Sequence, residues 1–173
     1  GVVIVHGSRG SDALDAAFAD VVRVSPDSSK LVCDLADSDA IRRMFETIEE
    51  TFGRIDVLVN NAAAKASSPF LDMSEEQWDR VLDVDLKAPF LCGQLAARIM
   101  KANGGGSIVN VGSVHERDVK RHESNYSVAK GGLLMLTKNM ALELAPYHIR
   151  VNQVAPGAIA TDMTPPERQR QIS

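Results

Sequence analysis

Three polar residues, Ser113, Tyr126 and Lys130, have the side-chain types and spacing needed to move a proton at a carbonyl or an alcohol. Tyr126 and Lys130 stand four residues apart, so on a helix both side chains leave the same face. A free tyrosine has a pKa of about 10, and a nearby ammonium group stabilises the phenolate and lowers that pKa. Tyr126 is therefore a candidate general acid or base, and Lys130 is the residue that would tune it.

Ser113 adds a third group to this pair. It follows an apolar, strand-like segment, residues 107–111, and precedes Tyr126 by thirteen residues. Ligands of parallel α/β sheets gather at the carboxyl ends of the strands, so a hydroxyl at this point can hold a substrate oxygen. Taken singly, Ser113 reads as a turn serine and the Tyr126–Lys130 pair as a solvated helix face. Their occurrence together favours a site.

The elements that must position these residues alternate along the chain. Short apolar runs are separated by longer segments of helical period, a pattern typical of a parallel sheet with crossover helices. Because the runs are almost wholly apolar, we expect the strands to be buried on both faces. The predicted strands are residues 2–6, 31–34, 55–60, 107–111 and 149–154.

Three helices are predicted between the later strands. The first is amphipathic, with Ser38 as a candidate cap and Gly53 as its end. The second opens at a capping box on Ser74 and reaches a kink or junction at Pro89. The third runs over residues 126–144 and would carry both Tyr126 and Lys130. No repeat divides the chain, so one domain over residues 1–173 is expected.

Composition narrows the class of protein. The chain has 173 residues, of which 45% are hydrophobic and 24% charged, with a net charge of −4. These values fit one globular domain with a real core, and the expected partner is a small molecule. No apolar run is long enough to span a membrane and no leader is recognised, so a cytoplasmic protein is expected. Basic residues are scattered, which argues against nucleic acid.

Histidine and cysteine are sparse. The four histidines and two cysteines lack the spacing that zinc ligands need, so no metal site is predicted. Cys33 and Cys92 lie in apolar surroundings, where a free cysteine behaves as a small hydrophobic residue. We expect both to be buried thiols.

Four motifs, in order along nearly the whole chain, resemble those of the short-chain dehydrogenase/reductase family. Asn60-Asn61-Ala62-Ala63 is similar to the family's NNAG, and Ser113 to its serine. Residues 126–130 match its YxxxK, and Pro156-Gly157 with Thr161 resembles its PG and threonine motif. The resemblance implies a three-layer, Rossmann-type, doubly wound parallel sheet. It also implies an oxidoreductase that transfers a hydride between a nicotinamide cofactor and a carbonyl or alcohol.

The resemblance also implies roles for individual residues. Tyr126 would donate or accept the proton, Lys130 would lower its pKa and hold the nicotinamide ribose, and Ser113 would orient the substrate oxygen. The family usually associates through helices corresponding to residues 74–100 and 126–145, so a homotetramer or homodimer is expected. The remaining residues implied in cofactor binding are Asp34 and Leu35 at the adenine, Asn61, Ala62 and Ala63 at the adenosine half, Ile159 and Thr161 at the nicotinamide carboxamide, and Pro156 and Gly157 of the PG motif.

Asp85 departs from the family pattern. It stands in Val84-Asp85-Leu86, where the family usually carries an asparagine that completes the catalytic group. We therefore place Asp85 with the catalytic residues. A carboxylate near Lys130 would favour the charged form of that lysine but offset the field that it exerts on Tyr126. The hypothesis is that Asp85→Asn raises the catalytic rate.

The glycine-rich TGxxxGxG turn of the family is not intact in this chain, and two interpretations are open. In the first, residues 2–6 are the family's second strand and residues 12–22 its second crossover helix, with the opening strand, turn and helix absent. In the second, residues 6–10 are a shortened relic of the turn and residues 21–25 are the second strand. The first is preferred because its spacing to Asp34 needs no internal deletion.

The cofactor expected depends on that choice. Under the first interpretation Ser8 and Arg9 follow the second strand, where an arginine is placed to take the ribose 2′-phosphate of NADP. NADP is therefore the expected cofactor, with NAD as the alternative. Under the second interpretation the preference is unknown. Because the chain ends at Ser173, soon after the segment where the family's substrate lid begins, we expect a domain incomplete at both ends.

The substrate is left open by these motifs. Ser113-Val114-His115-Glu116, residues 130–146 and residues 154–161 resemble the glucose 1-dehydrogenase-like branch, and beta-ketoacyl carrier-protein reductases share most of this pattern. His115 and Glu116 either line a polar substrate pocket or are solvated loop residues. A rival hypothesis is a catalytically impaired member that binds nucleotide or a partner, which Asp85 and the missing glycine turn would favour.

Overall fold

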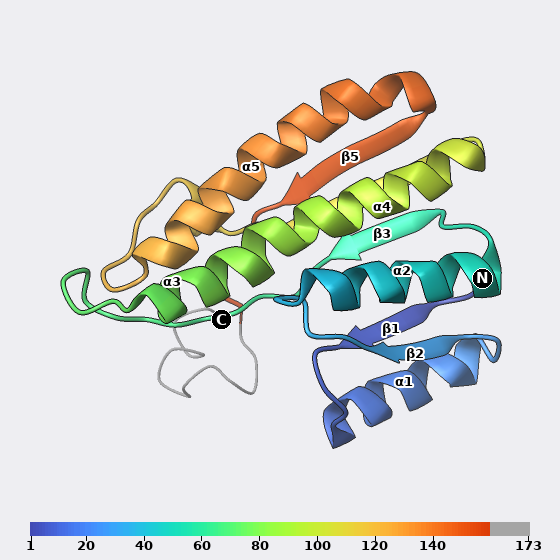
Figure 1. The fold of residues 1–173 in the computed structure, drawn as a ribbon, viewed down its shortest axis with the longest axis horizontal. Helices are drawn as coiled ribbons and strands as arrows, with labels where there is room; N and C mark the ends of the chain where they lie inside the picture. The colour runs from blue at the N-terminus through green and yellow to red at the C-terminus, as the bar shows by residue number, and fades with distance from the viewer. Residues whose placement is uncertain (160–173) are drawn as a thin grey trace.

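The computed structural model describes residues 1–159, which form an α/β structure with parallel strands (Figure 1). A π-helical turn, Asp83–Lys87, joins two of the helices. In chain order the strands and longer helices are β1 (Ile4–Gly7), α1 (Asp12–Val24), β2 (Ser29–Val32), α2 (Ser38–Phe52), β3 (Val57–Asn60), α3 (Glu75–Leu82), α4 (Ala88–Ala102), β4 (Gly106–Val111), α5 (Ser124–Leu144) and β5 (Ile149–Val154).

The strands form two parallel ladders. β1 pairs with β2, and β4 lies between β3 and β5. In Figure 1, β1 lies between β2 and β3, so the chain first moves outward from β1 to β2 and then returns past β1 to β3. This reversal is the topology of a doubly wound sheet. The predicted α/β fold class is confirmed.

The N-terminal segment decides between the two interpretations of the missing turn. Residues 12–24 are helical in α1, so a strand over residues 21–25 is wrong. The local cause is a strong helix start: the Ser11 side chain accepts a hydrogen bond from Leu14 N, and Asp12 and Asp15 lie in the positive first turn. The strand, helix and strand order of the first interpretation is the one observed.

The ends of the next helices follow the sequence closely. α2 ends at Gly53, whose φ of 66° is the left-handed conformation that glycine adopts without strain. Its cap is Asp37 rather than Ser38, because the Asp37 carboxylate accepts from the backbone N of Asp39 and Ala40. α3 begins at the predicted capping box, with Ser74 and Gln77 bonded reciprocally.

A continuous core lies between the strands and the helices α2, α4 and α5, which Figure 1 shows in front of the sheet. Cys33 and Cys92 are free thiols buried in this core, as predicted, and burial raises the pKa of Cys92 to about 12. The fully buried residues of this core include Ile41, Ala96, Met100, Ile108 and Ile149.

Burial on both faces is wrong for β3. Val57 and Val59 are 61% and 56% exposed, whereas Leu58 between them packs against the core. Successive strand residues point to opposite faces, so only one face of β3 is covered by the described residues. The apolar composition of the strand therefore does not by itself report how many layers cover it here.

Candidate active site

The carboxyl ends of the strands place most predicted site residues along one edge. In Figure 1 the strand arrows of both ladders point the same way, and the predicted residues follow their tips. Thr161 lies outside the described residues. The predicted residues that follow a strand end are Ser8 and Arg9 after β1, Asp34 and Leu35 after β2, Asn61, Ala62 and Ala63 after β3, Ser113 after β4, and Pro156, Gly157 and Ile159 after β5.

Lys130 lies at the centre of the catalytic cluster, by which we mean Ser113, Tyr126, Lys130 and Asp85. Its Nζ donates to the Val111 carbonyl at 3.0 Å and lies 3.2 Å from Asp85 Oδ2. The same nitrogen is 5.5 Å from the centroid of the Tyr126 ring. Lys130 is only 2% exposed and Asp85 is fully buried. The structure thus brings Asp85 to Lys130, as the family position of Asp85 implied.

The π-helical turn explains how an acidic residue reaches this interior. The turn carries one more residue than an α-helical turn, and its Val84 and Asp85 both face inward. Asp85 Oδ1 accepts a hydrogen bond from Ala64 N at 2.6 Å, which ties the turn to the loop after β3. The turn approaches α5 at Gly132, where a Cβ atom would lie 2.9 Å from Leu86 Cδ2. A larger residue than glycine would require the Leu86 side chain to shift.

The electrostatics of Tyr126 differ from the sequence expectation. Burial raises its pKa above the ordinary value, and the negative charges of Asp85 and Glu123 raise it further. A hydrogen bond with Ser113 lowers the pKa without reversing the net direction. Since the Lys130 ammonium is paired with Asp85, a lowered Tyr126 pKa is not what this arrangement produces. Ser113 and Tyr126 are nevertheless brought together as predicted.

The pKa of Asp85 is also shifted from its ordinary value. Burial raises the pKa of its carboxyl, while the Lys130 charge and the Ala64 hydrogen bond oppose that rise. A buried carboxyl with a raised pKa beside a buried ammonium is typical of functional sites as well as of structural ion pairs. The charge on Asp85 is therefore coupled to the state of both Lys130 and Tyr126.

Asn125 is a site residue that the sequence analysis missed. It is 1% exposed, and its Nδ2 donates to the carbonyls of Ala66 at 3.0 Å and Gln77 at 3.1 Å. Its Oδ1 accepts from Tyr126 N at 2.8 Å. Asn125 thus joins the loop after β3, the helix α3 and the start of α5. Its position next to the YxxxK motif was the one available signal.

Arg80 was missed as well. Its Nη1 donates to both carboxylate oxygens of Asp34, at 2.8 and 2.9 Å. Asp34 has a lowered pKa, first because the Ala36 backbone N donates to it and then because of Arg80. The predicted adenine contact is therefore already held by an ion pair from α3. No local pattern connects these two residues, which are 46 positions apart.

The solvated-loop alternative is wrong for Glu116, while the substrate-pocket alternative stays a prediction. The Glu116 side chain is 4% exposed, so it is not a solvated loop residue. Its carboxylate accepts a hydrogen bond from Gln153 Nε2 on β5 and is thus occupied within the protein. His115 lies against the catalytic cluster, with its ring centroid 6.3 Å from that of Tyr126.

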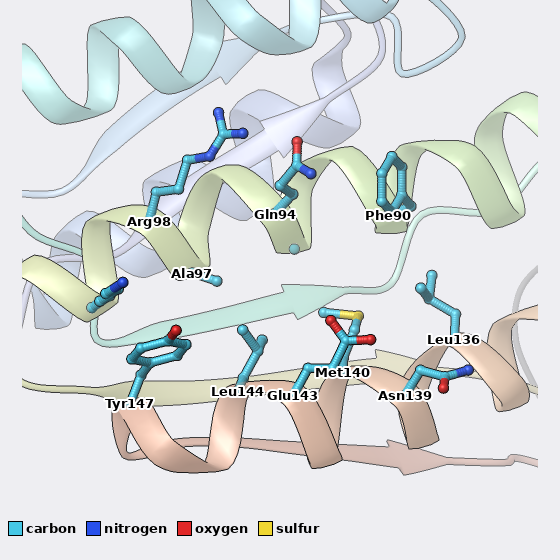
Figure 2. Close-up of a pocket in the computed structure, with 12 residues that line it drawn as sticks. Phe90, Gln94, Ala97, Arg98, Leu136, Asn139, Met140, Glu143, Leu144 and Tyr147 are labelled. Atoms are coloured by element: carbon cyan, nitrogen blue, oxygen red, sulfur yellow. The ribbon is translucent and has the colours of Figure 1, made fainter.

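A groove lies apart from this cluster, between α4 and α5 (Figure 2). Figure 2 shows the lining residues Phe90 and Gln94 on α4 and Leu136 and Met140 on α5. The helices come close at Gly93, where a Cβ atom would lie 2.5 Å from Met140 Cε. None of the lining residues is Ser113, Tyr126 or Lys130, so the groove is not the candidate active site.

Within the part of the chain that the structure describes, neither a metal-binding cluster nor a membrane-spanning helix is present. Among residues 1–159, no group of three histidine, cysteine, aspartate or glutamate side chains is arranged to hold a metal ion. None of the helices in the same range combines the length and hydropathy needed to cross a membrane.

Comparison with known proteins agrees with the fold. The family model for short chain dehydrogenases matches residues 1–172. A 3-oxoacyl-[acyl-carrier-protein] reductase of Synechocystis sp. is 37% identical over 162 residues, which are 94% of this chain and 66% of that protein. The uncharacterized oxidoreductase YohF of Escherichia coli is 52% identical over 119 residues, 68% of this chain and 47% of its own.

Solved structures give the same result. Acetoin dehydrogenase YohF from Salmonella typhimurium has a TM-score of 0.85 at 37% identity, covering 94% of this chain and 74% of its own. A gluconate 5-dehydrogenase from Burkholderia cenocepacia, in complex with NADP and tartrate, has a TM-score of 0.82 at 30% identity, covering 92% of this chain and 62% of its own.

The chain therefore belongs to the short-chain dehydrogenase family. It spans about two thirds of the length of the Synechocystis reductase and about half of Escherichia coli YohF.

Proposed function

We propose that the protein carrying this chain is an oxidoreductase that transfers a hydride between NADP(H) and a carbonyl or alcohol substrate. One observation carries the proposal: Ser113, Tyr126 and Lys130 converge just past the end of β4, with Lys130 fully inside the protein. A buried ammonium and a half-buried phenol beside a hydroxyl are the groups that proton transfer at a substrate oxygen requires.

Each residue has a distinct role in this proposal. The Ser113 hydroxyl orients the substrate oxygen, and the Tyr126 phenol donates the proton in reduction or accepts it in oxidation. Lys130, held by the Val111 carbonyl and Asp85, keeps a positive charge below the ring and reaches the nicotinamide ribose. The bound nicotinamide supplies or accepts the hydride. Asp85 acts on Tyr126 through its charge.

The residues along the carboxyl edge fit a dinucleotide cofactor. Arg9 is exposed just past β1, where its guanidinium can take a ribose 2′-phosphate, so NADP is proposed with NAD as the alternative. The gluconate 5-dehydrogenase with 30% identity is in complex with NADP, which supports this choice. Asp34 and Leu35 would lie at the adenine and Asn61, Ala62 and Ala63 at the adenosine half. Pro156, Gly157 and Ile159 would lie near the carboxamide, with Thr161 proposed there from the sequence alone.

The test is turnover by a full-length protein that carries this sequence. Reduced-nicotinamide absorbance would be followed with NADP(H) and NAD(H) against acetoin, gluconate, simple sugars and acetoacetyl thioesters, the substrate classes suggested by the similar proteins. We expect turnover with at least one of these classes and a lower KM for NADP(H). Tight cofactor binding without turnover would instead favour a catalytically impaired, nucleotide-binding member of the family.

We also propose that the protein associates with copies of itself through α4 and α5. α5 is apolar on more than one side: Ala129 and Leu133 are buried, while Val128, Met135 and Leu142 are 50%, 50% and 77% exposed. A helix that is apolar all round is normally covered all round. A homotetramer or homodimer would cover it. A cytoplasmic location remains a prediction from the sequence.

A further inference from the structure

A hydrogen-bonded pair of side chains lies beside Ser113 and has no part in the proposed proton transfer. Glu116, on the short 3-10 turn Val114–Glu116, accepts from Nε2 of Gln153 on β5. Gln153 Oε1 in turn lies 2.8 Å from the Thr137 hydroxyl of α5. The other carboxylate oxygen of Glu116, Oε1, lies 3.6 Å from Nε of Arg117, whose side chain is 75% exposed, while the Glu116 side chain is only 4% exposed. Burying a carboxylate in a surface turn is costly unless its hydrogen bonds are specific.

The side chains of Glu116 and Gln153 pack against Gly112, the residue before Ser113. A Cβ atom on Gly112 would lie 2.4 Å from Gln153 Nε2 and 2.7 Å from Glu116 Oε2. Gly112 does not have a positive φ, so the space and not the backbone conformation requires glycine at this position. The absence of a side chain at residue 112 is what allows Glu116 to reach Gln153.

The backbone around Ser113 is tied to the same strand end. Gly112 N donates to the Val154 carbonyl at 2.7 Å, and Val114 N donates to the Pro156 carbonyl at 3.1 Å. Ser113 Oγ accepts from His115 N at 3.2 Å. Glu116 therefore closes the far end of a short segment, residues 112–116, whose near end is already bonded to β5 and the residues after it.

Behind Gln153 the contacts continue into the sheet. Asn110 Nδ2 donates to the Thr137 hydroxyl at 2.9 Å, and Asn60 Nδ2 donates to Asn110 Oδ1 at 2.8 Å. Asn110 is fully buried and Thr137 is 5% exposed. The anchor of Glu116 is thus a polar network that joins β3, β4 and α5, and its partners have little freedom to follow a displaced side chain.

We infer that Glu116 is a positioning residue: its hydrogen bond to Gln153 clamps the 3-10 turn onto β5 and fixes the Ser113 hydroxyl relative to Tyr126. The inference rests on the proposed function for its effect on catalysis. A displacement of about 1 Å in a group that orients a substrate can cost roughly 100-fold in rate. A loosened turn would thus act on the substrate oxygen and leave cofactor binding at the strand edge unchanged.

Three variants separate this role from a general packing role. Glu116→Ala removes the acceptor, whereas Glu116→Gln keeps an acceptor oxygen for Gln153 at the same length. Gly112→Ala places a methyl group between the two side-chain ends, which are flexible enough to move aside without unfolding the chain. Arg121→Ala is the matched control, since it changes an exposed arginine of the following loop and leaves Glu116, Gln153 and Arg117 in place.

The full-length protein is assayed for kcat and KM of the best substrate and for the Kd of NADPH. We expect Glu116→Ala and Gly112→Ala to lower kcat/KM by about 10- to 100-fold with an unchanged NADPH Kd. Glu116→Gln and Arg121→Ala should stay within about threefold of the wild type. The Glu116→Ala/Gly112→Ala double variant should be no worse than either single variant, because both break the same contact.

Amide hydrogen exchange measures how firmly residues 112–116 are held, and it does not depend on turnover. The amides of Val114 and His115 should exchange at least about tenfold faster in Glu116→Ala and Gly112→Ala than in the wild type, Glu116→Gln or Arg121→Ala. Unchanged exchange in Glu116→Ala, or equal losses of activity in the alanine and glutamine variants, would overturn the inference. If the variants show the expected differences in exchange but the wild type has no turnover, the proposed function is wrong and the positioning role of Glu116 is still supported.

Discussion

At the scale of single residues, Asp85 sets the character of the site. It occupies the position of the asparagine that the sequence led us to expect, and it pairs with Lys130 at 3.2 Å. Both the burial of Tyr126 and the Asp85 charge raise the Tyr126 pKa, so the phenolate forms less readily at neutral pH. The oxidation direction, which needs the phenolate, should be the direction most affected.

Asp85→Asn should therefore lower the Tyr126 pKa and speed alcohol oxidation at neutral pH. Removing the negative charge makes the phenolate easier to form, so the rising limb of kcat/KM against pH should shift toward lower pH. In the reduction direction, where the neutral phenol is needed, the falling limb should shift the same way. Rates of both reactions measured across pH check this. Asp83→Asn, at a partly exposed carboxylate of the same turn paired with Lys87, is the control. Identical profiles for wild type and Asp85→Asn would refute the role given to its charge.

What the sequence could and could not predict at this scale has a physical cause. Tyr126 and Lys130 share a face of one helix, so their proximity follows from helical periodicity alone. Arg80 with Asp34, and Asn125 with Ala66, meet because separate elements pack together. Such pairings depend on the tertiary arrangement, and no local pattern encodes them.

At the scale of elements, turns and caps were the most predictable features. The capping box at Ser74 and the left-handed end at Gly53 follow from side-chain chemistry within a few residues. The π-helical turn at Asp83–Lys87 could not be foreseen, since its sequence is compatible with an unbroken helix. It is stabilised by contacts from outside, above all the hydrogen bond from Ala64 N to Asp85.

Asn125→Ala tests how α5 is held at its active end. The change leaves the carbonyls of Ala66 and Gln77 without their donor in a buried place, so unfolding free energy should fall by about 2–3 kcal/mol. Thr47→Ala removes an exposed hydroxyl with one local bond and should cost less than about 0.5 kcal/mol. Urea unfolding of both variants is the measurement. Equal stability of the two would show that Asn125 does not join these elements.

At the scale of the whole molecule, the exposed apolar residues are unevenly placed. The outer sides of α4 and α5 and one face of β3 carry several of them, while the core between the sheet and these helices is closed. Fold class was predictable because the alternation of strands and helices fixes the architecture. The number of layers covering each strand was not, since apolar strands look alike whether one or both faces are packed.

Phe90→Glu should weaken self-association if the α4–α5 groove is the contact between copies. Phe90 lines the groove and is 44% exposed, so a carboxylate there would be desolvated in the assembly. Sedimentation at several concentrations should show the wild type as a tetramer or dimer and Phe90→Glu shifted toward monomer. Phe70→Glu, at a residue 78% exposed away from the groove, should behave as the wild type. A monomeric wild type would rule out this assembly.

The most direct test of the account is single-turnover and steady-state kinetics of Tyr126→Phe beside the wild type. Phenylalanine keeps the ring and its packing but has no proton to give or accept. We predict that the full-length wild type oxidises NADPH with a carbonyl substrate, and that Tyr126→Phe lowers kcat by roughly 10²- to 10⁴-fold while the NADPH Kd stays unchanged. Wild-type turnover that survives in Tyr126→Phe would contradict the central role given to this tyrosine.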